Sequence, residues 1–121
     1  SLIGVLAQRL VRRLCDACKE PHAPDAAEAA EFAGREVPRT LYRAKGCPEC
    51  AYTGYAGRMG IYELLEISDT VRRMIHDRVS DQVIREHARD VANVRFLRED
   101  GLRWVAAGHS MLEEILRATR D

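Results

Sequence analysis

The four cysteines of this chain fall into two Cys-x-x-Cys pairs, Cys15 with Cys18 and Cys47 with Cys50. A Cys-x-x-Cys turn directs two thiolates toward one point, and two such turns supply four soft ligands in a tetrahedron. Thiolates favour zinc over harder cations. The spacing therefore predicts a closed structural zinc site, in which all four ligands come from protein and no position is left for a substrate.

Other uses of the cysteines are less well matched by this pattern. A thioredoxin-like redox pair needs only one of the two turns, and a pair of disulfides implies secretion, whereas the chain shows no signal peptide. An iron–sulfur cluster could use the same four thiolates and stays open. His22, four residues after Cys18, is a further candidate ligand. We expect it to lie outside the site, because four cysteines already complete a tetrahedron.

Charge argues against a nucleic-acid partner, and hydropathy argues against a transmembrane segment. The 121 residues include 19 basic and 19 acidic side chains, and the two halves are separately balanced, so the basic surface of a nucleic-acid binder is missing. The apolar runs are far shorter than the ~20 residues of a transmembrane helix. We expect no nucleic-acid partner, no transmembrane segment and a reducing cytoplasm. The chain starts at Ser1 rather than at a methionine, which suggests a piece of a longer protein.

Hydrophobic spacing in the first half of the chain predicts short strands around the cysteine turns. A helix is expected over residues 2–9, with Ser1 as its cap, followed by a strand over 10–14 that enters the first turn. An alanine-rich helix is predicted over 26–33. Further strands are expected over 41–44 and 61–67.

Helical periodicity dominates the second half. Helices are predicted to follow Ser68 and Ser80, to cover 97–107 with an interruption at Gly101, and to start at a capping box formed by Ser110 and Glu113. The second of these helices is expected to turn Val91 inward. The four should pack as a small bundle. The predicted class is therefore α+β, with a small tetracysteine zinc subdomain built on short strands and a C-terminal helical bundle.

The residues reveal no catalytic constellation. The glycine-rich stretch 54–60 lacks the lysine and the serine or threonine of a phosphate-binding loop, since the chain's two lysines are Lys19 and Lys45. It is interpreted as tight turns beside the metal site. His76, His87 and His109 share no spacing that would join them. On residues alone, the chain is an interaction or scaffold module.

Four stretches resemble the secretion ATPases, the family that powers type II secretion and type IV pilus assembly. They are Leu6 to Cys15 (LAQRLVRRLC), Gly46 to Leu65 with its GCPEC, TGY and GRMGIYELL blocks, Leu97 to Leu102 (LREDGL), and Leu112 to Arg117 (LEEILR). The TGY block and the RATRD ending are more similar to the type II branch. Of the family's functional residues, only the metal ligands Cys15, Cys18, Cys47 and Cys50 transfer to this sequence.

The resemblance implies a parent protein that is a homo-hexameric ATPase at the cytoplasmic face of the bacterial inner membrane. It would hydrolyse ATP, with Mg, to drive pseudopilus assembly together with inner-membrane platform and anchor proteins. Residues 1–14 would be the end of its RecA-like core, 15–67 the tetracysteine zinc-binding subdomain with the following strand, and 68–121 the C-terminal helical subdomain. The chain itself would be structural. The alternatives are a fragment of a type IV pilus assembly ATPase and a stand-alone zinc-ribbon adaptor.

Overall fold

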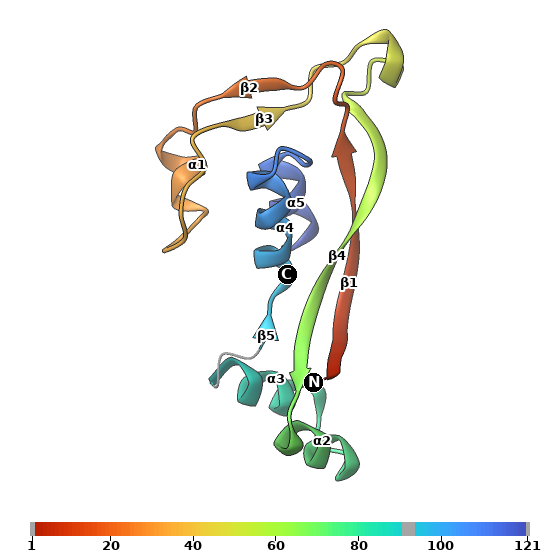
Figure 1. Ribbon diagram of the computed structural model, residues 1–121, viewed down its shortest axis with the longest axis vertical. Coiled ribbons are helices and arrows are strands. Elements are labelled where there is room, and N and C mark those ends of the chain that lie inside the picture. Colours follow the sequence, from red (N-terminus) through yellow and green to blue (C-terminus); the bar gives the residue numbers. More distant parts are fainter. Residues whose placement is uncertain (1, 91–93, 121) are drawn as a thin grey trace.

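Two long strands form the axis of the computed structural model, which describes residues 2–90 and 94–120. Strand β1 (Leu2–Leu14) pairs antiparallel with β4 (Tyr55–Ile67), from Leu2 opposite Ile67 to Leu14 opposite Tyr55. Figure 1 shows the pair as one twisted ribbon, with the remaining elements arranged along it. A short strand, β5 (Val94–Arg95), pairs with β4 near the end of the ribbon that holds the N-terminus.

The helix predicted over residues 2–9 is wrong, because this segment is the first part of β1. Its apolar residues have a helical spacing, but they do not share one buried face. Leu6 packs into a core, whereas Ile3 and Leu10 are 66% and 58% exposed. Pairing with β4 over the whole segment outweighs a local pattern. The predicted cap Ser1 and the predicted inward-facing Val91 lie outside the described residues.

Residues 15–54 connect the two long strands. This connecting segment, called the excursion, begins and ends at a cysteine turn. It contains β2 (Glu20–His22), α1 (Ala26–Ala30), β3 (Leu41–Arg43) and the 3-10 turn η1 (Pro48–Cys50). Strands β2 and β3 form an antiparallel hairpin that leaves the end of the ribbon (Figure 1). The predicted strand over 41–44 is confirmed, and helix α1 is shorter than the predicted range 26–33.

Four helices follow β4, namely α2 (Asp69–His76), α3 (Asp81–Asp90), α4 (Leu97–Ala106) and α5 (Leu112–Ala118). Ser68 caps α2 as predicted, since its hydroxyl accepts from the Val71 amide at 3.2 Å. The capping box predicted at Ser110 is wrong, because Met111 occupies the cap position of α5. The buried Ser110 hydroxyl instead donates to the carbonyl of Arg12 on β1, at 3.2 Å.

The α+β class is confirmed, but the four helices divide between two cores instead of forming one bundle. Helices α2 and α3 pack near one end of β4, whereas α4 and α5 lie between the ribbon and the β2–β3 hairpin (Figure 1). The smaller core contains Leu65, Val71, Ile84 and Ala88. The larger core contains Val11, Phe32, Leu41, Ile61, Leu102, Val105, Leu112 and Ile115. In the described part of the chain, no helix is long and apolar enough to cross a bilayer.

Gly101 was expected to interrupt its helix, yet α4 runs through it without a break. The glycine is needed for packing, because a Cβ at this position would lie 2.5 Å from Cγ2 of Ile115 on α5. We expect Gly101→Ala to destabilise the chain by about 1 kcal/mol, the clash less the gain in helix propensity. The overpacked contact costs roughly 1–3 kcal/mol, which exceeds the helix propensity of about 1 kcal/mol that alanine adds. Urea unfolding measures this change.

A double-mutant cycle with Ile115→Ala tests the steric cause. The smaller side chain leaves room for the methyl group of Gly101→Ala, so the double variant should lose less stability than the sum of the two single losses. Strict additivity of the two losses would argue against this packing explanation.

Candidate metal centre

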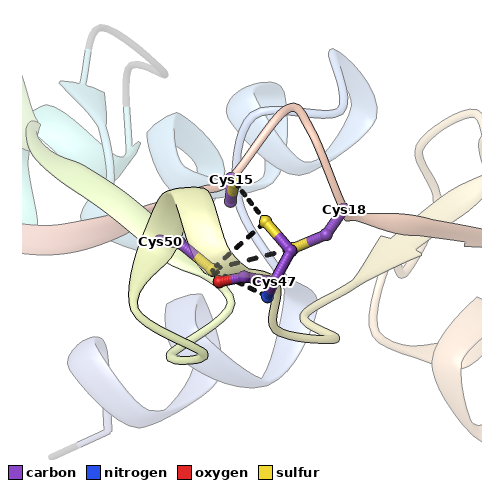
Figure 2. Close-up of side chains that lie close together, drawn as sticks. All are labelled: Cys15, Cys18, Cys47 and Cys50. Carbon is purple, nitrogen blue, oxygen red and sulfur yellow. Dashed lines mark hydrogen bonds between the residues drawn. The ribbon is translucent and has the colours of Figure 1, made fainter.

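The four cysteine sulfurs lie together at the end of the ribbon where the excursion begins and ends. Figure 2 shows the side chains converging from the two turns. The Sγ atoms of Cys15 and Cys47 are 3.9 Å apart, and Cys50 Sγ lies 3.8 Å from those of both Cys18 and Cys47. All four sulfurs lie within 4.8 Å of one another, and none of these cysteines is in a disulfide.

These spacings have the size of a tetrahedral metal–thiolate centre. A Zn–S bond of about 2.3 Å gives a regular tetrahedron an edge of about 3.8 Å. The printed sulfur separations of 3.8 and 3.9 Å match that edge. They are far longer than the bond of about 2.0 Å in a disulfide. The four residues could therefore hold one metal ion, with no protein ligand beyond the cysteines.

Backbone hydrogen bonds shape each turn so that its two sulfurs face the same point. In the first turn, the amides of Cys18 and Lys19 donate to the carbonyl of Cys15, at 3.3 and 3.0 Å. In the second, the Cys47 carbonyl accepts from the amides of Cys50 and Tyr52, at 3.2 and 2.8 Å. Each turn is thus shaped by hydrogen bonds within its own backbone.

Amide groups also donate directly to the sulfurs. Cys50 Sγ accepts from the amides of Cys47 and Gly54, both at 3.2 Å, and Cys18 Sγ accepts from Gly46 at 3.4 Å. Burial raises the pKa of Cys50, but the amide donors of Cys47 and Gly54, together with the side chains of Cys47 and Cys18, outweigh it and bring the value to about 6. At Cys18, burial prevails and raises the pKa to about 11. The site therefore favours a thiolate at Cys50, the form in which cysteine binds a metal.

Gly54 has a backbone conformation and a packing position that suit glycine. Its φ is +84°, and a Cβ there would lie 2.6 Å from the Cβ of Ala44. We expect Gly54→Ala to cost about 3 kcal/mol and to weaken metal binding, because the left-handed conformation costs roughly 1–2 kcal/mol and the clash adds to it. Thermal unfolding and a competition titration with a chromogenic chelator measure the two effects.

Gly57→Ala is the matched control for this variant. Gly57 also has a positive φ, +81°, but a Cβ there would meet nothing within 4 Å. It should lose only the conformational term of roughly 1–2 kcal/mol and keep its metal affinity. Equal losses of metal affinity in the two variants would contradict the role assigned to the contact between Gly54 and Ala44.

Hydrogen bonds connect the first cysteine turn to the helical part of the fold as well as to the strands. The Leu14 amide donates to the carbonyl of His109 at 2.9 Å, and the Lys19 ammonium donates to the carbonyl of Gly108 at 2.8 Å. Asp16 pairs with Lys19 at 3.0 Å. The candidate centre therefore joins three parts of the fold, namely the ribbon, the β2–β3 hairpin and the turn between α4 and α5.

Comparison with known proteins places the chain in a family. Residues 1–117 match the family model described as type II/IV secretion system protein. The chain belongs to this family. It is similar over its whole length to the type II secretion system protein E of Pseudomonas aeruginosa (49% identity) and to the type II secretion system ATPase E of Vibrio cholerae (45%). It is 42% identical, over 98% of its length, to the type IV pilus assembly ATPase PilB of Thermus thermophilus.

This secretion-family chain spans only part of the length of its relatives. It covers 24% of the Pseudomonas and Vibrio proteins and 14% of the Thermus protein. The resemblance inferred from the sequence is thereby confirmed at the level of the family. The activities named for the relatives describe proteins about four or more times as long as this chain.

Among the predicted site residues of this secretion-family chain, the four cysteines are brought together and His22 is not. His22 Nε2 lies 3.0 Å from a carboxylate oxygen of Glu28, and its Nδ1 accepts from Arg43 at 3.4 Å. In the described residues, no other group of three or more potential ligands gathers, so His76, His87 and His109 do not form a second site. Sequence reasoning missed the amide of Gly54 as a donor to Cys50, although the glycine-rich stretch marked the segment.

Proposed function

We propose that this chain is the C-terminal zinc-binding part of a type II secretion ATPase. The observation that carries the proposal is a four-sulfur cluster of tetrahedral size inside a chain that matches the secretion family over residues 1–117. One of the similar proteins is named as an ATPase of the type II system. The chain itself would have no catalytic role, and its function would be structural.

The metal proposed for the centre is zinc. Its preference for thiolates and for tetrahedral coordination agrees with the donor set of Cys15, Cys18, Cys47 and Cys50. When bound, zinc would supply a cross-link between two chain segments and no open coordination position. The residues of this chain do the rest, since the two turns orient the sulfurs and the amide of Gly54 stabilises the Cys50 thiolate.

The full-length protein would hydrolyse ATP, with Mg, and use the energy to assemble a pseudopilus. It would work as a homo-hexamer at the cytoplasmic face of the inner membrane, in contact with the secretion platform and its anchor proteins. Residues 1–14 would join the RecA-like ATPase core, 15–67 would form the metal subdomain and 68–121 the helical subdomain. Relatives named as a type II secretion system protein and as an ATPase of that system support the activity proposed for the full-length protein.

Metal analysis and secretion by the full-length protein test this proposal. The wild-type protein should contain one zinc per chain and support secretion in cells. Cys15→Ser and Cys47→Ser should lose the zinc and stop secretion, because each removes one of four ligands. Normal secretion by a zinc-free variant would refute the structural role of the metal.

A type IV pilus ATPase is the second candidate, since the PilB relative is 42% identical. Complementation separates the two. The full-length gene should restore secretion in a strain that lacks its type II ATPase, and should leave a strain without its pilus ATPase unpiliated. A stand-alone adaptor is tested by the coding sequence upstream of Ser1, where an ATPase requires Gly-x-x-x-x-Gly-Lys-Ser/Thr.

A further inference from the structure

Four arginines converge on one cavity between the ribbon and the helices. The cavity has a volume of about 330 Å³ and is lined by Arg9 of β1, Arg85 and Arg89 of α3, and Arg98 of α4. Glu63 of β4 is the only carboxylate among the lining residues, so the formal charge of the lining is 4 − 1 = +3. This local excess stands in a chain whose net charge is zero.

Three of these arginines have no carboxylate partner within residues 2–90 and 94–120. Arg9 donates to the carbonyl of Gln8 at 3.1 Å, and Arg98 donates to the Thr119 hydroxyl at 3.0 Å. The guanidinium of Arg89 lies over the ring of Phe96, 5.4 Å from its centroid. Each guanidinium is a cation with five N–H donors, and in the part of the chain that the structure describes none of these donors bonds to a carboxylate.

Arg85 and Glu63 lie opposite each other among the lining residues, as an ion pair. Arg85 Nη2 forms an ion pair with Glu63 Oε1 at 3.1 Å, without the geometry of a hydrogen bond, and the buried Arg85 Nε has no hydrogen-bond partner among the described residues. A buried charged donor without an acceptor is costly. The Arg85 side chain as a whole is 42% exposed, so an anion in the cavity would be attracted by the positive charge of its guanidinium.

We infer that this cavity binds a small phosphate-bearing anion. Guanidinium groups bind phosphate oxygens in a bidentate way, and several of them converging on one cavity suit a group with several oxygens and more than one negative charge. A volume of about 330 Å³ lies at the lower end of typical small-molecule sites. The anion would bridge α3 of the smaller core, α4 of the larger core and β1, which contributes to both, and so hold the two cores together.

Isothermal titration of the 121-residue chain with inorganic pyrophosphate tests the inference. We expect one saturable site per chain, and a loss of about tenfold in affinity for each of Arg89→Gln and Arg98→Gln, since one charge-assisted hydrogen bond contributes roughly a factor of ten. Both side chains are exposed, so these substitutions should leave the fold unchanged. Arg72→Gln on α2 removes the same charge from an exposed arginine outside the cavity and should leave the affinity unchanged.

A second measurement, with phospholipid vesicles, identifies the source of the phosphate. Binding to anionic phospholipid vesicles that is lost in Arg98→Gln would identify a lipid headgroup, whereas binding of soluble pyrophosphate alone would identify a free phosphate compound. Absence of saturable binding, equal weakening by Arg72→Gln, or equal affinity for citrate would each overturn it. Because the titration measures neither zinc nor ATP hydrolysis, its failure would leave the proposed function untouched.

Discussion

Cys47→Ser is expected to abolish stoichiometric zinc binding and to unfold the excursion between the two long strands. The proposed zinc would hold together both ends of residues 15–54, and this segment contributes Phe32 and Leu41 to the larger core. In zinc-finger peptides, metal binding contributes about 10–16 kcal/mol at neutral pH, which is comparable with the whole stability of a small domain, roughly 5–15 kcal/mol. Circular dichroism and metal analysis before and after treatment with a strong chelator measure the loss.

Glu49→Gln is the matched control, because Glu49 lies between Cys47 and Cys50 in the same turn but is exposed. It should keep one zinc per chain and a wild-type spectrum. The wild-type chain treated with chelator should resemble Cys47→Ser. If zinc leaves Cys47→Ser while the protection of the Leu41 amide against hydrogen exchange stays unchanged, the fold does not depend on the metal, and the structural role is wrong.

The clustering of the four cysteines could be predicted because the geometry of each turn is local. A Cys-x-x-Cys turn closes through its own backbone, as the bonds from Cys18 to Cys15 and from Cys50 to Cys47 illustrate. No distant contact is needed to bring two sulfurs of one pair together. The sequence also indicated the α+β class and the helix after Ser68, whose cap is formed by a residue three positions from its partner.

Elements that depend on distant partners could not be predicted from local patterns. Residues 2–9 have helical spacing, yet their pairing partner is β4, more than 50 residues away along the chain. Ser110 has the sequence of a helix cap, yet its hydroxyl bonds to Arg12 across the core. The cavity arginines come from three separate elements, so nothing in the sequence groups Arg9 with Arg85 and Arg98.

Glu114 is the clearest example of a residue whose environment could not be predicted from the local sequence. Within the sequence it is one of two adjacent glutamates in the first turn of a helix, a position typical of an exposed residue. In the structure its carboxylate is buried against β1, where it accepts from the Arg12 amide at 2.9 Å and from the Arg12 guanidinium at 2.8 Å. Arg117 adds a third donor, at 2.6 Å. Burial raises the pKa of Glu114, but these donors outweigh it and lower the value to about 2.

Glu114→Gln is therefore expected to remove about 3 kcal/mol of stability at pH 7. The carboxylate has a pKa of about 2 in the folded chain and 4.5 as its ordinary value, and 2.5 units correspond to roughly 3.4 kcal/mol. Since the folded value is the lower one, the contribution is complete above pH 4.5 and is lost as the pH falls toward 2. Urea unfolding of both proteins between pH 7 and pH 3 measures the gap, which is the difference in free energy of unfolding between the wild type and Glu114→Gln.

The gap between the two proteins should shrink steadily below pH 4.5. Both keep the same cysteines, so any acid-induced loss of metal affects them alike and cancels in the difference. Glu113→Gln, at the exposed neighbouring position, should stay within about 0.5 kcal/mol of the wild type at every pH. A gap that does not change with pH would mean that shape, rather than the charge on Glu114, holds α5 against β1. A loss in Glu113→Gln as large as in Glu114→Gln would mean that helix-end charge, and not the bonds to Arg12, provides the stability.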